Sequence, residues 1–515
     1  MKIFVCLVSL ILLSIGAIAQ SKSELPHIIF IMTDQQRSDA LGCMGNDAVI
    51  SPHIDKLAEE GVRFTNGYSS VPSCTPARAG LLTGLSPWHH GMLGYGRVAR
   101  QYKYEMPQML REAGYYTFGI GKMHWYPQKA LHGFHGTLVD ESGRVEQDGF
   151  ISDYRDWFKL QAPGQNPDKT GIGWNEHRAD VYQLEENLHP TYWTGKTAID
   201  LIENYDNDKP LFLKVSFARP HSPYDPPQRF LDMYDGKEIP KPFVGEWDTE
   251  WKEIDGGKSA AFGDFGTEHA LKSRRYYYAN ITFIDEMVGK IIQALKEKGM
   301  YENSIICFTS DHGDMLGDHY HWRKTYAYEG SANIPFILKW PENLEEKLPR
   351  GSILENTTEL RDFLPTFLDA AGAEIPKEMD GLSILKLIRD PNPEWRPYID
   401  LEHATTYNEK NYWTALTDGV WKYIWFFRTG EEQLFNLKDD PGELGDLSQS
   451  NSEELKKWRK RMIEHLRERG EGFVKDDQLV IREETLLYSP NYPKDERTDA
   501  ERLKFWNEIY KGTNE

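Results

Sequence analysis

The sequence predicts an α/β fold with a large, doubly wound and mostly parallel sheet that carries helices on both faces. Three observations support this: short apolar segments recur, each ends in charged or imidazole groups, and helical patterns separate them. Continuous apolar strands are typical of parallel sheets, because both of their faces are covered. Strands that alternate with helices favour the doubly wound arrangement.

Four apolar segments are predicted to be buried strands with polar ends. They are residues 28–32 before Thr33-Asp34-Gln35-Gln36, 116–120 before Gly121-Lys122-Met123-His124, 211–217 before Arg219-Pro220-His221, and 305–309 before Ser310-Asp311-His312-Gly313. In a doubly wound sheet, ligands bind beyond the carboxyl ends of the strands. We therefore expect these polar residues to converge on one site.

Helical patterns lie between the strands, at residues 51–60, 106–113 and 276–298. The last segment has apolar residues at three- and four-residue steps, as expected for a helix that packs one side against a sheet. These are Ile281, Ile284, Val288, Ile291, Ile292 and Leu295.

The sequence pattern changes after Leu385, where several prolines interrupt any helix. Residues 413–427 then have the pattern of short strands with a turn at Asp418-Gly419, and residues 452–469 have a charged helical pattern. We expect a catalytic domain over residues 24–400 and a smaller C-terminal α+β domain with an antiparallel sheet over residues 401–515.

The first 19 residues have the pattern of a secretory signal peptide. Lys2 precedes an apolar run from Ile3 to Ile15, and Ala17-Ile18-Ala19 is a small-residue cleavage signal. The alternative is a membrane anchor, but the apolar run is shorter than the roughly 20 residues of a span, and no Cys follows it to accept a lipid. We therefore expect an exported protein without a membrane anchor. In a bacterium it would be periplasmic or secreted, and in a eukaryote it would be lysosomal.

The composition limits the partners. The 515 residues include 60 Lys and Arg against 80 Asp and Glu, which gives a formal net charge of −20. The contents of 39% apolar and 27% charged residues are those of a globular protein. An acidic field repels polyanions over a broad surface, so nucleic acid is excluded as a predicted partner.

A distinctive segment stands between the first two predicted strands and begins at Cys74-Thr75-Pro76-Ala77-Arg78. Pro76 suits the first turn of a helix, which places Cys74 at the positive N-terminal end and Arg78 on the same face. A thiol beside a cation and a helix N-terminus suits a nucleophile that attacks an anionic centre. From the residues alone, the alternative is a buried cysteine in a helix cap.

The pattern C-x-P-x-R-x-x-x-x-T-G from Cys74 to Gly84 resembles the signature of the type I, formylglycine-dependent sulfatases of the alkaline phosphatase superfamily. The other strand ends match that family in order, and the segments 433–437 and 440–443 are similar to its C-terminal pattern. The resemblance implies an alkaline phosphatase-like fold. It also implies that a formylglycine-generating maturation enzyme converts Cys74 to formylglycine, whose hydrated aldehyde is the nucleophile.

The resemblance further implies one divalent metal ion, for which we expect Ca²⁺. Its ligands would be Asp34, Gln35, Asp311 and His312, together with the modified Cys74. Carboxylate and amide oxygens suit a hard cation. Family members commonly have Asp where Gln35 stands and often Asn where His312 stands, and imidazole also suits softer ions.

Cleavage of a sulfate ester requires a clamp of cations and an acid. By resemblance, Arg78 holds the formylglycine and the sulfate, while Lys122 and Lys324 bind sulfate oxygens. His124 resembles the partner that activates the formylglycine, and His221 the acid that protonates the leaving alcohol.

Further residues are weaker candidates. Those predicted to contact the substrate are His89, His90, His319, Glu402 and His403. The segment 311–321 also holds Asp314, Asp318 and His321, which leaves a second metal site open, although we favour a polar loop that borders the pocket.

The predicted function is an exported sulfatase that acts on sulfated carbohydrates, namely glycosaminoglycan-type oligosaccharides. The segment Ser310 to His319 resembles members that act on uronate 2-O-sulfates. One alternative is a phosphonate or phosphate ester hydrolase of the same superfamily, because such members share the signature. Another is a glycan-binding protein without catalysis, in which Cys74 stays unconverted.

Overall fold

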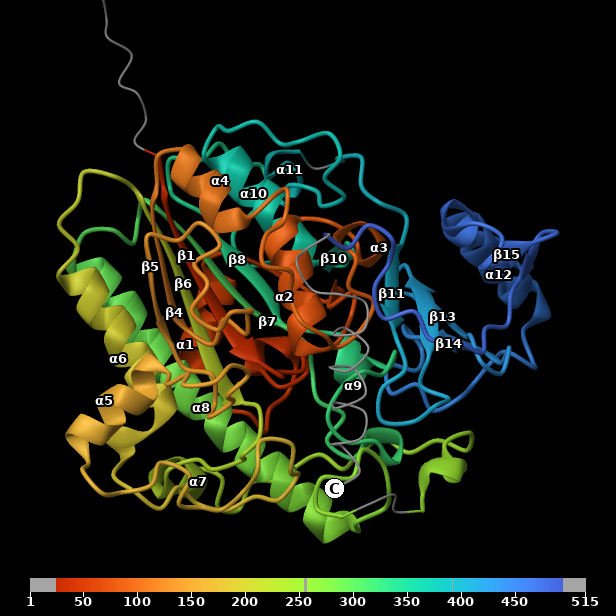
Figure 1. The fold of residues 1–515 in the computed structure, drawn as a ribbon, viewed down its shortest axis with the longest axis horizontal. Coiled ribbons are helices and arrows are strands. Elements are labelled where there is room, and N and C mark those ends of the chain that lie inside the picture. The colour runs from red at the N-terminus through yellow and green to blue at the C-terminus, as the bar shows by residue number, and fades with distance from the viewer. Residues whose placement is uncertain (1–24, 254–256, 391, 494–515) are drawn as a thin grey trace, which may run out of the picture.

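The computed structural model describes residues 25–253, 257–390 and 392–493, so the predicted signal peptide lies outside the described residues. An eight-stranded sheet forms the centre, in the order β5-β4-β6-β1-β7-β8-β2-β9 (Figure 1). Strand β8 is antiparallel to both of its neighbours, and the other pairs are parallel. The strands are β1 (His27–Asp34), β2 (Val62–Phe64), β4 (Tyr116–Gly121), β5 (Gly136–Val139), β6 (Leu211–Pro220), β7 (Ser304–Ser310), β8 (Phe336–Lys339) and β9 (Ser352–Leu354).

The four strands predicted from apolar segments are β4, β6, β1 and β7, which are consecutive neighbours in the sheet. In register, Ile29 of β1 pairs with Leu213 of β6 on one side and with Ile306 of β7 on the other. Because these strands are parallel, their carboxyl ends lie at one edge. The predicted fold class is confirmed.

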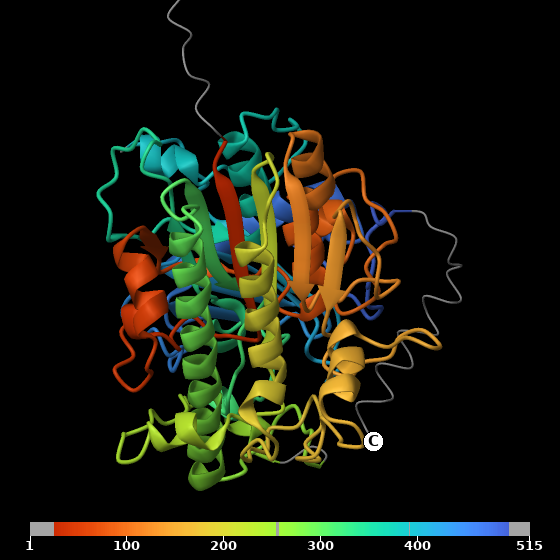
Figure 2. The ribbon, with the colours of Figure 1, turned by 90° about the vertical axis from the view of Figure 1, so that its left-hand side faces the viewer.

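Helices cover both faces of this sheet. Successive side chains of β1 point to opposite faces, so they pack against different helices. Ile28, Phe30 and Met32 belong to the core under α2, α4 and α10, whereas Ile29 and Ile31 belong to the core under α1, α6 and α8. Figure 2 shows α6 and α8 lying along one face. The helices are α1 (Pro52–Glu59), α2 (Cys74–Thr83), α4 (Met106–Glu112), α6 (Pro190–Glu203), α8 (Thr267–Glu297) and α10 (Phe363–Ala370).

The predicted helices at residues 51–60 and 106–113 are α1 and α4. Helix α8 begins at Thr267, well before the predicted start at Tyr276, because its first turns carry polar side chains that hide the helical period. Shorter elements complete this part: β3 (Gly67–Tyr68), β10 (Thr358–Glu359), α3 (Pro87–His90), α5 (Asp153–Gln161), α7 (Gln228–Asp232), α9 (Glu329–Ala332), α11 (Leu385–Arg389) and 3-10 turns at Gly42–Met44, Glu186–Leu188, Thr249–Trp251, Asp318–Tyr320 and Leu360–Asp362.

A four-stranded antiparallel sheet, β11-β12-β13-β14, follows, and α12 packs against it. The predicted turn at Asp418-Gly419 joins β12 to β13, and Asp418 Oδ1 accepts from the backbone N–H of Trp421 at 2.8 Å. The Glu402 N–H donates to Ser70 O at 2.8 Å, which fixes β11 beside the signature segment. The elements are β11 (Ile399–His403), β12 (Trp413–Thr417), β13 (Trp421–Phe426), β14 (Glu432–Asn436), α12 (Ser452–Leu466), a 3-10 turn at Arg467–Arg469, β15 (Val474–Lys475) and β16 (Gln478–Leu479).

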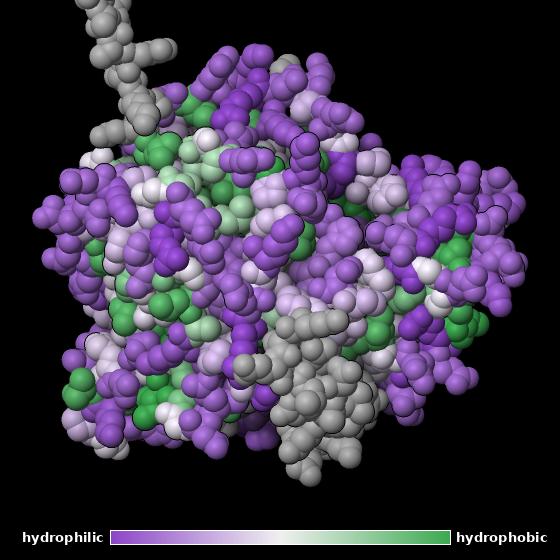
Figure 3. All heavy atoms as spheres, turned by 45° about the horizontal axis from the view of Figure 1, so that its top comes forward, coloured by the Kyte–Doolittle hydropathy of each residue, from purple (hydrophilic) through white to green (hydrophobic). Residues whose placement is uncertain are grey.

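The outside of the molecule is mainly polar on the face in Figure 3, where apolar side chains form small, separate patches. Within the described ranges, no helix is both long enough and apolar enough to cross a bilayer.

Lys214, in the middle of β6, is a buried cation. Its ammonium group lies 5.4 Å from the centre of the Trp125 ring. In the described part of the chain, no carboxylate lies within 4.0 Å of it. Burial, and then repulsion by Arg78, lower the pKa of Lys214 to about 7.

Replacement of this lysine should flatten the pH dependence of stability. Between about pH 7 and 10 the unfolded chain holds a proton on Lys214 that the folded protein lacks, so stability rises with pH by up to about 1.4 kcal/mol per unit. In Lys214→Met, the free energy of unfolding, measured by urea titration across this range, should lose that rise. The surface variant Lys159→Met should keep it, and parallel curves for wild type and Lys214→Met would contradict the assignment.

Candidate active site

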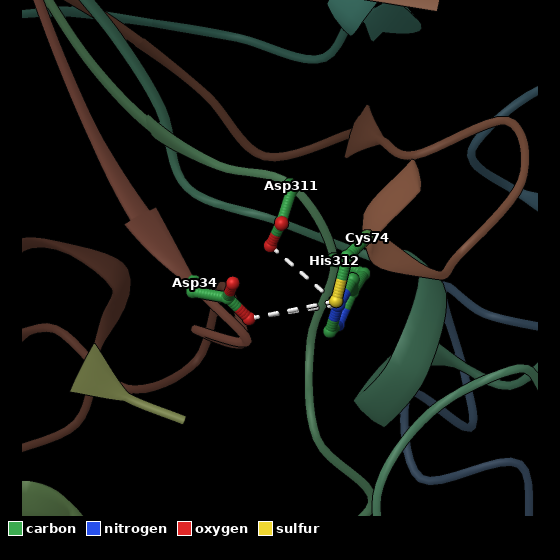
Figure 4. A group of neighbouring side chains, drawn as sticks. All are labelled: Asp34, Cys74, Asp311 and His312. Carbon is green, nitrogen blue, oxygen red and sulfur yellow. Dashed lines mark hydrogen bonds and ion pairs between the residues drawn. The ribbon is translucent and has the colours of Figure 1, made fainter. Parts of the chain in front are cut away.

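Four side chains that are distant in sequence meet beyond the carboxyl ends of β1 and β7. Asp34 is the last residue of β1, Asp311 and His312 follow β7, and Cys74 is the first residue of α2 (Figure 4). One ligand atom from each lies within 4.8 Å of all the others. Cys74 Sγ lies 3.2 Å from His312 Nε2 and 3.8 Å from Asp34 Oδ1.

Helix α2 places Cys74 at its positive end, as the sequence predicted. The helix ends at Gly84, whose φ of 69° is left-handed and whose N–H donates to Gly80 O at 2.9 Å. A Cβ at this position would lie 2.8 Å from the sulfur of Met379, so glycine is required there. At the other end, Ser73 Oγ lies 2.8 Å from His403 Nε2.

Arg78 joins the strand ends. Its Nε donates to Asp311 Oδ2 at 2.9 Å and its Nη2 to Asp34 Oδ2 at 3.4 Å. Its Nη1 donates to the Lys122 carbonyl at 2.5 Å and to Ser216 Oγ at 3.2 Å. The guanidinium therefore holds the Oδ2 atoms of both carboxylates, and the Oδ1 atoms face Cys74 and His312.

Two lysines surround the thiol. Lys122 Nζ pairs with Asp34 and lies 3.8 Å from Cys74 Sγ, and Lys324 Nζ lies 3.4 Å from the same sulfur. Burial opposes the charged form, yet Lys122, Lys324 and His312 hold the pKa of the Cys74 thiol well below its usual value. The site therefore stabilises negative charge at this position.

Gln35 directly follows the end of β1 with a left-handed φ of 68°. Its Oε1 accepts from Lys324 Nζ at 2.8 Å, its Nε2 donates to Asp314 Oδ2 at 2.5 Å, and its backbone N–H donates to Asp311 Oδ1 at 3.1 Å. The amide is thus held at the edge of the cluster with its oxygen on the side of Lys324.

His221 completes the cationic side. Lys324 Nζ lies 2.8 Å from its Nε2, and its Nδ1 donates to the Ser222 carbonyl at 2.9 Å. Burial and the charge of Lys324 hold the pKa of His221 well below its usual value, so its free imidazole is neutral.

Comparisons with known proteins decide the family. Residues 26–373 match the family described as Sulfatase, and residues 317–471 match that described as N-sulphoglucosamine sulphohydrolase, C-terminal. The chain belongs to the sulfatase family. It is a sulfuric ester hydrolase, and these matches are consistent with the formylglycine-dependent sulfatase family of the alkaline phosphatase superfamily.

Relatives of this sulfatase carry several names. It is 40% identical to the arylsulfatase of Clostridium perfringens over an alignment of 477 residues. The alignment covers 88% of this chain and 97% of the relative. The choline-sulfatase of Rhizobium meliloti is 32% identical (82% of this chain, 83% of the relative), and the N-acetylglucosamine-6-O-sulfatase of Bacteroides thetaiotaomicron is 26% identical (94% and 93%).

The phosphonate monoester hydrolase of Agrobacterium radiobacter shares the fold, with a TM-score of 0.71 at 22% identity over 89% of this chain and 100% of that one.

His124 lies at the site on the loop after β4, also with a left-handed φ of 56°. Its Nε2 lies 3.2 Å from Glu146 Oε1 and 3.3 Å from the Tyr95 hydroxyl. Its backbone N–H donates to Glu141 Oε1 at 2.8 Å. An imidazole oriented by a carboxylate is the usual arrangement of a general base.

Four residues near the site were not predicted from the sequence: Tyr95, Glu141, Arg144 and Glu146. The last three follow β5, whose short sequence begins with Gly136 and forms no continuous apolar run. The polar segment 140–146 was the only sign of these residues in the sequence. Because no strand was predicted before it, the sequence did not place the segment at the edge of the sheet where the other site residues lie.

The residues predicted to contact substrate are only partly brought to the sulfatase site. His403 lies next to Ser73, and burial lowers its pKa to about 4. The other four have contacts elsewhere: His89 with Asp380 at 2.8 Å, buried His90 with the Met92 N–H at 3.2 Å, His319 with Asp248 at 2.9 Å, and Glu402 with Arg469 at 2.7 and 2.8 Å. Their roles as substrate contacts remain predictions.

The polar loop after His312 uses its carboxylates within the protein. Asp314 accepts from Gln35 and Tyr224, and Asp318 pairs with Arg37 and Arg274. A cavity of about 950 Å³ lies on that side, lined in part by Arg37, His319 and Glu443, and Cys74 does not line it. The cluster rather than this cavity holds the reactive groups.

The donors of the cluster fit a metal ion. Ligand bonds to Ca²⁺ are about 2.3–2.6 Å long, so two ligand atoms on one ion lie at most about 5 Å apart, and the four atoms here fall within 4.8 Å. In the neutral imidazole that binds a metal, His312 Nδ1 donates to the Gly313 carbonyl at 2.9 Å, so Nε2 can present its lone pair to the ion. Asp34, Asp311, His312 and residue 74 would hold the ion, with the Gln35 oxygen nearby.

Metal binding should stabilise the folded protein. In chelator-stripped enzyme, Ca²⁺ at about 100 times its dissociation constant should add about 2.7 kcal/mol, seen as a rise in melting temperature. Asp311→Asn should lose most of this rise, because the carboxylate supplies one ligand, while the surface variant Asp200→Asn keeps it. An undiminished rise in Asp311→Asn would remove Asp311 from the ligand set.

Proposed function

We propose that this protein is an exported sulfatase that hydrolyses sulfate esters of carbohydrates, with a formylglycine made from Cys74 as nucleophile. One observation carries the proposal: a cysteine at a helix N-terminus lies beside Lys122 and Lys324, while Arg78 fixes the two carboxylates next to it. This arrangement draws a sulfate group to the nucleophile and neutralises charge that develops in the transition state.

The substrate class we propose is glycosaminoglycan-type oligosaccharide, with uronate 2-O-sulfate as the finer hypothesis. The similarity to a relative named N-acetylglucosamine-6-O-sulfatase over 94% of this chain supports a sulfated sugar. The predicted signal peptide supports export, to the periplasm or outside the cell. The further partner is the maturation enzyme that acts on Cys74, and the net charge of −20 disfavours nucleic acid.

In this proposal the nucleophile side consists of His124 and Glu146. Glu146 orients the imidazole, which removes a proton from the hydrated aldehyde at residue 74. Lys122 and Lys324 bind oxygens of the sulfate, which keeps the sulfur in line with residue 74. Bound Ca²⁺ would supply further positive charge for the sulfate oxygens.

The leaving-group side consists of His221 and Lys324. The free imidazole accepts a hydrogen bond from the Lys324 ammonium, and a bound anionic ester favours its protonated form. We assign the proton that reaches the leaving alcohol to this pair, with His221 as the acid.

The runner-up function is hydrolysis of phosphonate or phosphate esters. The fold of the Agrobacterium radiobacter phosphonate monoester hydrolase is the supporting observation. Parallel turnover of an aryl sulfate, a phosphodiester and a phosphonate monoester distinguishes the two. Dominant phosphonate hydrolysis would overturn the sulfatase proposal, and binding of sulfated sugars with no turnover would favour the glycan-binding alternative.

Mass spectrometry of the peptide that contains Cys74 should show the aldehyde in place of the thiol. The protein should come from its natural host or be produced with a maturation enzyme, and Cys307 in the same sample serves as an unmodified control. Only thiol at residue 74 in active enzyme would reject the formylglycine mechanism.

The acid role of His221 is tested by the leaving group. A sugar alcohol needs a proton as it leaves, whereas an activated aryl alcohol leaves readily, so His221→Ala should slow the sugar sulfate by about 10²–10⁴-fold and the aryl sulfate far less. Steady-state kcat values for both substrates measure the effect. Equal losses on the two substrates would reject the assignment, and the surface variant His53→Ala controls for substitution itself.

A further inference from the structure

Arg144 is a buried cation at the active site that lacks a carboxylate partner. The residue is 6% exposed, and among the described residues no carboxylate oxygen lies within 4.0 Å of its guanidinium. Its Nη1 is buried without any hydrogen-bond partner. A buried charge is costly unless it is paired, so an unpaired arginine beside a catalytic site indicates a missing anion.

Other buried arginines of this protein show what such a side chain normally has. Among the described residues, most of them are paired with a carboxylate, for example Arg219 with Asp225, Arg274 with Asp318, Arg361 with Asp400, and Arg469 with Glu402. Arg323 also lacks a carboxylate, but its Nη2 donates to the backbone carbonyl of Ser259. Arg144 Nη1 has neither kind of acceptor.

The position of Arg144 does not depend on its guanidinium. Its backbone N–H donates to the Glu141 carbonyl at 3.0 Å, and its carbonyl accepts from Gln128 Nε2 at 3.0 Å. Glu141 in turn accepts from the backbone N–H groups of Met123 and His124. The loop therefore presents the side chain in advance of any ligand, as a pre-organised binding group must be.

The guanidinium lies on the leaving-group side. Arg144 Nη2 is 3.4 Å from His221 Nε2, the nitrogen that the leaving oxygen must reach. The guanidinium also lies over the Trp174 ring, with its carbon 4.6 Å from the ring centre, and Trp174 is 40% exposed. The Ser222 hydroxyl lies within hydrogen-bond distance of the carbonyls of Gly173 and Glu176, which holds the tryptophan loop next to His221.

We propose that Arg144 is a specificity-determining residue that binds a second oxyanion, a carboxylate or a further sulfate, on the alcohol part of the substrate. This rests on the proposed sulfatase function. A group within hydrogen-bond reach of Arg144 lies a few bonds from the ester oxygen, while Trp174 covers an apolar face of the same leaving group. The guanidinium fork suits a planar carboxylate through two parallel hydrogen bonds.

Matched substrates test the proposal. Aryl sulfates that carry a carboxylate are compared with carbamoyl analogues of the same shape, at the ortho, meta and para positions so that reach is not limiting. In the wild type, kcat/KM should favour the carboxylate at one position or more. In Arg144→Gln the ratio of carboxylate to carbamoyl should fall by about 10–100-fold there, Arg144→Lys should keep part of it, and the surface variant Arg229→Gln should keep it fully.

The outcomes are distinct. Equal losses on both members of every pair would overturn the proposal, because Arg144 would then act on the scissile sulfate or on structure alone. Failure of the wild type to release sulfate from any substrate would instead overturn the proposed function. If Arg144→Gln does not fold, inhibition of the wild type by hydroxybenzoates and by hydroxybenzamides decides: tighter binding of the carboxylates supports the subsite, and equal binding rejects it.

Discussion

The contacts of Arg78 are the constraint on which the rest of the site depends. One guanidinium group binds Asp34 at the end of β1, Asp311 after β7, the Lys122 carbonyl after β4 and Ser216 on β6. These four strands are consecutive neighbours, so their polar ends are already close before any side chain is placed. The arginine comes from α2, the helix that begins with Cys74, and it therefore ties the nucleophile to the sheet. Loss of this cation would leave two buried carboxylates poorly paired, which is among the most destabilising changes that a protein core undergoes.

The same contacts explain how an acidic protein can receive an anionic substrate. The formal net charge of −20 acts at long range, where salt screens it beyond about 8–10 Å. Inside the site, Arg78, Lys122 and Lys324 are buried, and charge interactions there are much stronger than in water. Negative charge on the surface and positive charge in the site are thus compatible.

The sequence predicted those elements whose structure depends on residues close together in the chain. Continuous apolar runs identified β1, β4, β6 and β7, because strands covered on both faces have that pattern. The polar residues that follow these runs form the candidate site. Strand β5 is short and begins with glycine, so the residues after it went unrecognised. His89 follows the signature and Glu402 ends an apolar strand, and these positions suggested substrate contacts. Their partners, Asp380 and Arg469, lie far away in sequence. Long-range ion pairs of this kind leave no pattern in one sequence.

The two sides of the site differ in how they are built, and this difference bears on specificity. The groups proposed to act on the sulfate stand mainly beyond strand ends and on the first turn of α2, where the sheet and a buried arginine fix them. The groups proposed to lie near the leaving alcohol, Arg144 and Trp174, stand on loops that are held by the hydrogen bond from the His124 N–H to Glu141 and by the contact of the Ser222 hydroxyl with the Gly173 carbonyl. Loops tolerate substitution better than buried strands, so the leaving-group side can change while the sulfate side stays intact. Such a division allows one family to include relatives named for aryl, choline and N-acetylglucosamine sulfates.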